Sequence, residues 1–529
     1  MKKNEIIIAR KNELQNGQMK KVRIHEDKEV LLIRLDDQFY AGDTICPHYG
    51  APLERGALSG KKLMCPWHHA VFEIPTGLVC DPPALNGLAG YKLRVRGEDI
   101  ILFLEEGEIQ EKEDESKGKK RGKDDRSFVI IGGGAAGNAA ARQLRTLGYN
   151  GHIQIISADS QPPYDRPNLS KDYLRGDMDP DWLPLNEKDF FKEKQIELML
   201  EKQVMEVDPV GKQIVLDNRT KLRYDRLLIA SGGLPRRLNV PGIDLDNIFT
   251  LRTLNDAENI LKQAEKAERI TVIGASFIGM ETAENLNNGK REIHIIALEE
   301  MPFGHLFGND VGMMLKEKKE NSGIHFHLGR SVSEFRGNGK IEEIGLDNQE
   351  YIKSDLAILG IGVEPRTSFL PQFKKATDRS LITDEYLQVE NDVFAAGDMA
   401  TFPYWKSGDL IRIEHWRVAE QHGFIAANNM LGLNKKVEII PFFWTNLAGM
   451  ELRYVGYPGK WDYSIIKGDL FEENFIIYYI FNNRVNAALG VGQDEQMTVI
   501  ELLLSAGKMP SAEILKSKEM TAEKLRELI

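Results

Sequence analysis

Cysteine is scarce in this chain of 529 residues, and all three cysteines, Cys46, Cys65 and Cys80, lie within its first 80 positions. Everything after Cys80 lacks a thiol. Redox chemistry in that part must therefore run without a redox-active disulfide or a cysteine nucleophile. Three cysteines also form no obvious disulfide framework, which agrees with a reducing compartment.

Long apolar runs and an excess of basic residues are also missing. No stretch reaches the roughly 18 apolar residues of a membrane-spanning helix, and residues 1–17 hold no signal-peptide core. Lys and Arg number 69 against 80 Asp and Glu, which gives a formal net charge of -11. We therefore expect a cytoplasmic protein with neither nucleic acid nor a membrane as partner.

The chain is long enough for three or four domains at about 150 residues each. Residues 1–104 alternate short apolar runs with Gly and Pro, which predicts a small antiparallel all-β domain. Residues 105–126 are charged and nearly free of apolar side chains, which predicts a flexible linker. Beyond them, strand and helix patterns alternate as in doubly wound α/β domains, and a strand-rich stretch with two helical segments predicts an α+β domain at the end.

Two of the cysteines open paired motifs with histidine. Cys46 and His48 stand two apart, and Cys65 and His68 stand three apart on a later loop. Two thiolates can hold one iron of a [2Fe-2S] cluster while two imidazoles hold the other, which is the ligand set of a Rieske centre. The pattern therefore predicts a Rieske cluster held by these four residues.

Two alternatives compete with that ligand set. A zinc site also takes two Cys and two His, although a Cys-x-His step is unusual for zinc. His69 follows His68 directly and is the other candidate for the fourth ligand. We expect Cys80, which has no partner nearby, to be a small buried apolar residue.

A glycine turn marks the first dinucleotide site. Gly132, Gly134 and Gly137 follow an apolar strand and open a helix, an arrangement in which backbone approaches a pyrophosphate. Asp159 stands after the next strand, Ile153 to Ile156, where a carboxylate can bind an adenosine ribose. Together these residues predict the adenine-dinucleotide half of an FAD site.

A second glycine turn, Gly274 to Gly279, follows the strand Ile270 to Ile273, with Ser276 in place of the middle glycine. Ala297 stands at the position where a carboxylate would bind the ribose, with Glu299 close behind, and no Arg follows in the sequence to bind a 2′-phosphate. We expect NAD(P)H here, with NADH favoured over NADPH. The residues expected to bind it are Gly274, Ser276, Gly279, Glu281, Glu299 and Gly362.

Two dinucleotide units behind a Rieske motif identify a family. From Ser127 onward the sequence resembles the FAD-dependent pyridine-nucleotide reductases that serve Rieske-type and plant-type ferredoxins. With the fused N-terminal module it looks most like the apoptosis-inducing-factor-like Rieske flavoproteins. Tyr224 to Gly233, Val393 to Asp398 and Tyr164 to Lys171 carry the resemblance in the flavin domain.

The resemblance implies roles for individual residues and boundaries for the domains. Lys171 is expected beside the isoalloxazine and paired with Glu281 near the nicotinamide, and these two are the expected catalytic residues. Further FAD contacts are expected from Arg166, Ala230, Gly232, Arg252, Asp398, Glu414, His415, Trp416 and Trp444. The expected domains are Rieske at 1–104, FAD-binding at 127–250 and 385–437, NAD(P)-binding at 251–384 and C-terminal at 438–529.

The two Rieske loops carry Ala51 and Ala70 where the high-potential respiratory type has a disulfide, as in the ferredoxin-like Rieske proteins of aromatic-ring dioxygenase systems. We therefore expect a reduction potential toward the lower end of the Rieske range.

The expected activity is electron transfer from NAD(P)H through FAD to the Rieske cluster and on to an unidentified acceptor, which could be an oxygenase, a carrier protein, a quinone or dioxygen. A redox-sensing flavoprotein of the apoptosis-inducing-factor type, acting through partner binding, is the alternative. The sequence also leaves a homodimer open. A disulfide reductase needs a thiol near the flavin, and a Rieske oxygenase would not carry two glycine turns.

Overall fold

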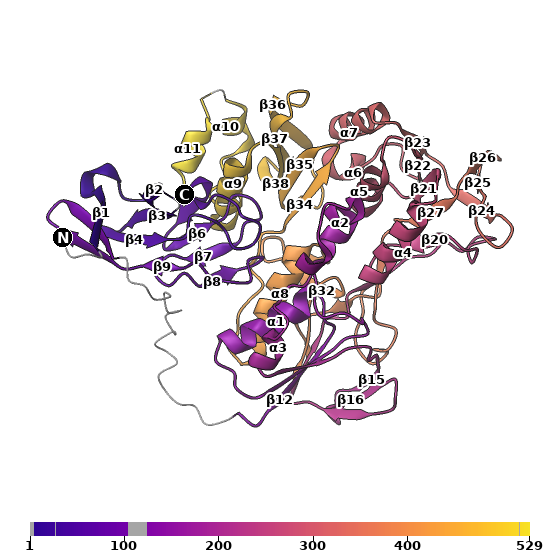
Figure 1. Cartoon of the computed structure of the whole chain (residues 1–529), viewed down its shortest axis with the longest axis horizontal. Coiled ribbons are helices and arrows are strands. Elements are labelled where there is room, and N and C mark those ends of the chain that lie inside the picture. Colours follow the sequence, from indigo (N-terminus) through magenta and orange to yellow (C-terminus); the bar gives the residue numbers. More distant parts are fainter. Residues whose placement is uncertain (1–4, 27, 104–123, 518) are drawn as a thin grey trace.

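The computed structural model describes residues 5–26, 28–103, 124–517 and 519–529. Apart from its last three residues, the predicted linker at 105–126 lies outside the described residues. Figure 1 shows the N-terminal domain in indigo beside the yellow C-terminal helices, with the α/β part of the chain on their other side. None of the helices described is long and apolar enough to cross a bilayer.

The N-terminal domain consists of three small antiparallel sheets, as expected from its alternating apolar runs. Their strand orders are β1-β11-β10, β2-β3-β4-β9 and β5-β6-β7-β8. The strands are β1 Glu5–Arg10, β2 Gln18–His25, β3 Lys28–Leu35, β4 Gln38–Gly42, β5 Ala57–Ser59, β6 Lys62–Met64, β7 Val71–Glu73, β8 Val79–Asp81, β9 Gly90–Tyr91, β10 Leu93–Arg96 and β11 Asp99–Phe103.

The first α/β unit contains a six-stranded sheet of order β14-β13-β12-β18-β31-β30, parallel except for its last pair. Its strands are β12 Ser127–Ile131, β13 His152–Ile156, β14 Ile196–Met199, β18 Arg226–Ile229, β30 Gln388–Glu390 and β31 Val393–Ala395. Its helices are α1 Ala135–Thr146, α2 Asp172–Arg175, α3 Phe190–Glu193 and α8 Trp416–Met430. Smaller sheets add β15 Val204–Asp208, β16 Gln213–Leu216, β17 Lys221–Arg223, β19 Gly233–Pro235, β29 Leu381–Ile382, β32 Ala400–Pro403 and β33 Leu410–Ile411.

The second α/β unit contains a five-stranded parallel sheet of order β20-β27-β21-β22-β23. Its strands are β20 Ile248–Thr250, β21 Arg269–Ile273, β22 Glu292–Ala297, β23 Ile324–Leu328 and β27 Leu356–Leu359. Its helices are α4 Leu254–Ala264, α5 Phe277–Leu286, α6 Gly304–Phe307 and α7 Asn309–Asn321. A hairpin sheet and one further strand complete it, with β24 Val332–Arg336, β25 Glu343–Leu346, β26 Tyr351–Lys353 and β28 Val363–Pro365.

The C-terminal domain is α+β, as expected, but three helices follow its strands where two were predicted. The sheet has the order β34-β35-β38-β37-β36. The unpredicted α10 has only five residues, too few for a periodic apolar pattern to stand out. The elements are β34 Phe442–Leu447, β35 Met450–Gly456, β36 Tyr463–Asp469, β37 Asn474–Phe481, β38 Arg484–Val491, α9 Asp494–Ala506, α10 Ala512–Lys516 and α11 Ala522–Arg526.

Helices α1 and α8 pack at very short range, and small residues permit it. A Cβ on Gly423 of α8 would stand 2.2 Å from the carbonyl oxygen of Ala136 on α1, so only glycine fits there. Since α1 begins at the first glycine turn, this contact places the start of α8 beside the predicted FAD site. That placement positions Trp416 and its neighbours.

Candidate functional site

The four predicted cluster ligands meet at the tips of two loops. Cys46 and His48 follow β4, and Cys65 and His68 connect β6 with β7. Each loop is closed by a backbone hydrogen bond, from the N–H of Cys46 to the carbonyl of Ala51 at 2.9 Å and from the N–H of Cys65 to that of Ala70 at 2.8 Å. These backbone hydrogen bonds fix the shape of each loop and so help to position its Cys and His side chains.

The ligands form two pairs. The Cys46 and Cys65 sulfurs contact each other, both residues are buried, and backbone N–H groups of the following residues point at them. The Nδ1 atoms of His48 and His68 are 3.1 Å apart. Burial lowers the pKa of His48 to about 4, so this imidazole is neutral at pH 7, which is the form that binds metals.

This donor set fits a [2Fe-2S] cluster, in which two thiolates serve one iron and two imidazoles the other. Among the residues that the structure describes, no group of three or more His, Cys, Asp or Glu side chains is placed to hold a single metal ion. The four predicted ligands are arranged as two pairs instead. The cluster would supply one-electron redox chemistry at this position.

The two neighbouring residues weighed in the sequence have other surroundings. The His69 ring is fully buried, stacks on Phe442 at 4.0 Å between ring centroids, and places Nδ1 2.5 Å from a Glu501 carboxylate oxygen. Cys80 is partly exposed, with its sulfur 4.0 Å from the Leu78 carbonyl. The expectation of a buried Cys80 is therefore wrong, because short β8 lies at the edge of its sheet.

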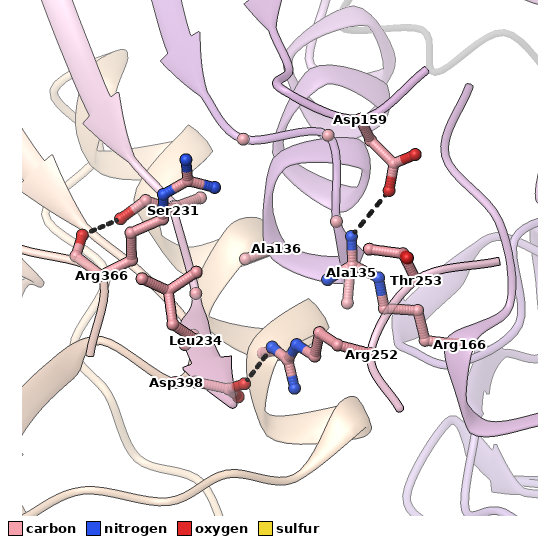
Figure 2. Close-up of a pocket in the computed structure, with 18 of the residues that line it drawn as sticks. Ala135, Ala136, Asp159, Arg166, Ser231, Leu234, Arg252, Thr253, Arg366 and Asp398 are labelled. Atoms are coloured by element: carbon pink, nitrogen blue, oxygen red, sulfur yellow. Dashed lines mark hydrogen bonds and ion pairs between the residues drawn. The ribbon is translucent and has the colours of Figure 1, made fainter. Parts of the chain in front are cut away.

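A cavity of about 770 Å³ lies between the first α/β unit, the start of α5 and β34. Figure 2 shows its walls, with Asp159, Arg166, Arg252 and Asp398 around one space. Its lining includes nearly all the residues predicted to contact FAD, namely Gly132, Gly134, Asp159, Arg166, Lys171, Ala230, Gly232, Arg252, Asp398, Glu414, His415, Trp416 and Trp444. Gly137 is not among them.

The first glycine turn explains why Gly137 stands apart. A Cβ at Gly137 would lie 1.9 Å from the carbonyl oxygen of Gly132, so Gly137 lets helix pack against turn. Gly132 itself has φ +114° and lies against Ala230. A Cβ added at Gly134 would have the Arg166 guanidinium, 4.0 Å away, as its nearest neighbour. This open space suits the close approach of a pyrophosphate.

Polar groups without partners point to a ligand in this cavity. Arg252 Nε and His415 Nδ1 are buried and have no hydrogen-bond partner among the residues that the structure describes. Arg252 also pairs with Asp398 at 2.8 Å, and Asp159 accepts hydrogen bonds from Tyr164 at 2.9 Å and Arg166 at 3.3 Å. Buried polar groups seldom remain unpaired, so the lining fits a polar, phosphate-bearing cofactor such as FAD.

The predicted pair of Lys171 and Glu281 is confirmed. Lys171 Nζ lies 2.8 Å from Glu281 Oε1, and the Glu281 side chain is almost fully buried. Ser170 and Thr445 each donate a hydroxyl to the same carboxylate at 2.5 Å. Glu281 is thus saturated by donors at the junction of α5, β34 and the segment before α2.

The second glycine turn repeats the first in its backbone. Gly274 has φ +108°, and a Cβ at Gly279 would stand 2.1 Å from its carbonyl oxygen. The Ser276 hydroxyl donates to the Gly360 carbonyl at 2.7 Å and accepts the Gly279 N–H at 3.3 Å, so it caps α5. Of the residues predicted to bind NAD(P)H, Glu281 lines the cavity, whereas Gly274, Ser276, Gly279, Glu299 and Gly362 lie outside it.

An arginine lies beside the end of β22, where the sequence predicts a ribose-binding position. The N–H of Arg330 bonds the Ala297 carbonyl at 3.0 Å, and its side chain is exposed. No Arg follows β22 directly in the chain, but Arg330 follows the neighbouring strand β23 and comes close to Ala297 only once the sheet forms. Sequence spacing alone could not show this.

The N-terminal domain is docked with its histidine tip against the cavity wall. The His68 ring lies 4.4 Å from the Trp444 ring, centroid to centroid, and His48 lies 6.2 Å away. Tyr49, which stacks on His48 at 4.0 Å, donates its hydroxyl to Asp165. Since Trp444 also lines the cavity, one indole separates the cluster ligand from the predicted flavin site.

Three family models match successive parts of the chain. Residues 4–92 match the Rieske [2Fe-2S] domain, residues 126–423 match pyridine nucleotide-disulphide oxidoreductase, and residues 442–528 match the reductase C-terminal domain. The second match alone spans more than half of the chain. The chain belongs to the pyridine nucleotide-disulphide oxidoreductase family.

Named relatives agree. Human apoptosis-inducing factor 3 is 35% identical over 518 residues, covering 95% of this chain and 84% of the relative. The 3-phenylpropionate/cinnamic acid dioxygenase ferredoxin--NAD(+) reductase component of Photorhabdus laumondii is 32% identical, covering 72% of this chain and 96% of its own. The reductase in a covalent putidaredoxin reductase-putidaredoxin complex superposes with a TM-score of 0.72 at 26% identity, covering 76% of this chain and 98% of that one.

The protein is therefore an FAD-dependent NAD(P)H oxidoreductase of the ferredoxin-reductase type with a fused Rieske domain, similar to apoptosis-inducing factors. The family description mentions a disulphide, but the part of this chain that forms the cavity cannot contain one, because no cysteine follows Cys80.

Sequence reasoning missed several residues of the site. Ser170 and Thr445 hold Glu281, and each directly adjoins a predicted residue, Lys171 or Trp444, so adjacency was the available signal. Arg366 also lines the cavity, and its carbonyl accepts the Ser231 hydroxyl at 2.8 Å (Figure 2). Nothing in its local sequence marks it.

Proposed function

We propose that this chain moves electrons from NAD(P)H through FAD to its own Rieske cluster and then to a separate acceptor. When held by the cavity residues, FAD would supply the conversion from a two-electron hydride donor to the single-electron steps that a one-electron cluster requires. The observation that carries the proposal is the docked tip, with His68 4.4 Å from Trp444 and Trp444 in the cavity wall. Electron transfer slows steeply with distance, so this contact favours the cluster as the next carrier.

We assign roles to the chain's own residues accordingly. Cys46, His48, Cys65 and His68 hold the cluster. Lys171 and Glu281 set the charge beside the flavin ring and the nicotinamide, and the other predicted cavity residues bind FAD. We also retain the domain boundaries expected from the sequence, with the reductase divided at 250, 384 and 437.

NADH remains our expected donor, because Ala297 at the end of β22 offers no positive charge to bind a 2′-phosphate and Glu299 follows it closely. Arg330 weakens this preference, because its backbone N–H bonds the Ala297 carbonyl at 3.0 Å and its side chain is exposed. NADPH should therefore act as a weaker donor.

The acceptor is defined here only by class. The bacterial relative is named as a component of a dioxygenase system, which supports an oxygenase or a carrier protein over a quinone or dioxygen. A homodimer and a cytoplasmic location also stay predictions, and light scattering on the purified protein checks the first.

The Cys46→Ser variant tests the assignment. We expect it to lose the cluster while NADH still bleaches the flavin at nearly the wild-type rate under anaerobic stopped-flow conditions. Single-electron delivery to an added one-electron acceptor should fall, because the outlet is gone. An intact Rieske EPR signal in this variant would refute the ligand set, and undiminished electron delivery would refute the route.

A further inference from the structure

Two successive residues in the first turn of α8 face different parts of the molecule, Trp416 the flavin cavity and Arg417 the Rieske domain. Trp416 lines the cavity, whereas Arg417 is fully buried, with 0% of its surface exposed. A fully buried arginine is rare unless its charge and all its donors are satisfied. The partners of Arg417 therefore indicate its purpose.

Those partners come from two domains that are not neighbours in the sequence. On the Rieske side, Arg417 donates to the carbonyls of Pro82 at 3.0 Å and His69 at 2.9 Å, and to Asp81 at 2.7 Å. On the C-terminal side it meets both oxygens of Glu501 on α9, at 2.9 and 3.1 Å. One guanidinium thus joins the FAD-binding, Rieske and C-terminal domains.

The surrounding charges depend on this residue. Glu501 also contacts His69 at 2.5 Å, and Asp81 also accepts from Gln421 of α8 at 2.7 Å. The positive charge of the Arg417 guanidinium faces both carboxylates, those of Asp81 and Glu501. Removing one member of such a buried group leaves the others uncompensated, which is strongly destabilising.

The network adjoins the cluster. His69, which contributes its carbonyl to Arg417, follows the ligand His68 directly in the chain, and the His69 ring stacks on Phe442. Phe442 starts the strand that carries Trp444, the residue against which His68 rests. Fixing His69 therefore fixes how closely His68 approaches Trp444.

We propose that Arg417 is a positioning residue that holds the Rieske domain in its electron-accepting pose against the reductase. This rests on the proposed function, because the pose matters only if the flavin reduces the cluster. Arg417 touches no reacting atom. Its removal should uncouple the two stages, leaving flavin reduction intact while cluster reduction slows.

The docked pose itself is tested first, by hydrogen exchange on the full-length holoprotein. In Arg417→Met we expect amides of β8 and of the loop at 65–70, which carries His69, to exchange about tenfold faster or more, because an unpaired buried carboxylate favours opening of the interface. Exchange in the sheets of the two α/β units should stay as in the wild type. Unchanged protection of β8 would overturn the proposal.

Two further variants guard against a misfolded product. Asp81→Asn is milder, since Asp81 is partly exposed, and should show the same change at smaller amplitude. The triple variant Arg417→Met, Asp81→Asn, Glu501→Gln removes the uncompensated charges and should recover part of the protection. If the triple variant were no better protected than Arg417→Met, charge compensation would not be the reason for docking.

The matched control is Arg55→Gln. Arg55 also bridges the Rieske domain to α9, pairing with Glu495 at 2.9 Å, but its side chain is 55% exposed. Exposed pairs contribute little, so this variant should behave as the wild type. An equal effect from both arginines would contradict a special role for Arg417.

Anaerobic stopped-flow kinetics with NADH then separates this inference from the function on which it rests. In Arg417→Met the flavin phase should stay within about twofold of the wild type, while the cluster phase slows by about tenfold or more, with the Rieske EPR signal preserved. A wild-type cluster that never becomes reduced would refute the proposed function. A wild-type cluster that is reduced no faster than that of Arg417→Met would refute only the positioning role.

Discussion

Glu281 illustrates, at the scale of single residues, how the site is assembled. Glu281 lies on α5. Its carboxylate pairs with Lys171 and accepts hydrogen bonds from Ser170 and Thr445, which come from two other parts of the fold. Lys171 and Glu281 were predictable from the family resemblance. Their hydroxyl donors were not, because a Ser or Thr hydroxyl gives no sequence signal until the partner is known.

The Glu281→Gln variant tests this assembly. Glutamine keeps the shape but leaves the Lys171 ammonium without its counter-charge, so we expect flavin reduction by NADH to slow by about tenfold. Stopped-flow absorbance of the flavin measures the rate. The Rieske EPR spectrum, which should not change, serves as the control; an unaltered flavin rate would argue against a role in hydride transfer.

Arg330 makes a second prediction at this scale. Because an exposed ion pair contributes up to about 1 kcal/mol, Arg330→Ala should raise the KM for NADPH by about fivefold and leave the KM for NADH unchanged. Steady-state kinetics with both donors checks it. Equal shifts with the two donors would mean that Arg330 does not face the 2′ position.

At the scale of elements, the two glycine turns were readable from the sequence because each follows a buried strand and opens a helix. The predicted strands at 153–156 and 270–273 lie within β13 and β21. Alternating apolar runs and φ-demanding glycines are local signals. The short α10 and the approach of Arg330 to β22 depend on tertiary packing and were missed.

Gly132→Ala tests the first turn. Its φ of +114° and the Ala230 carbonyl oxygen 2.2 Å from an added Cβ exclude a side chain. We expect the variant to be purified largely without flavin, measured by the ratio of absorbance at 450 to 280 nm. Full flavin content would show that this turn does not shape the FAD site.

Ser276→Ala tests the second turn. Loss of the cap on α5 should lower the free energy of unfolding by about 1 kcal/mol, read as a lower urea midpoint. Ser276→Gly is the matched control and should lose only a few tenths. Equal losses would show that the hydroxyl does not cap the helix.

At the scale of the whole molecule, the Rieske domain, the reductase and the C-terminal domain meet around one indole and one guanidinium. The sequence predicted these three parts, and it also predicted that the reductase contains no thiol. It could not predict Arg417, because its contacts with Pro82 and His69 span more than 330 residues and arise only when separately folded domains dock. The cavity was predictable where motifs are local and unpredictable where domains join.

The most direct test of electron flow from flavin to cluster is rapid-freeze EPR of the anaerobic holoprotein mixed with one equivalent of NADH. We expect the Rieske signal to grow in as the flavin phase completes, within a single turnover and without any added carrier. A flavin that becomes fully reduced while the cluster stays EPR-silent, although dithionite reduces it readily, would contradict the account.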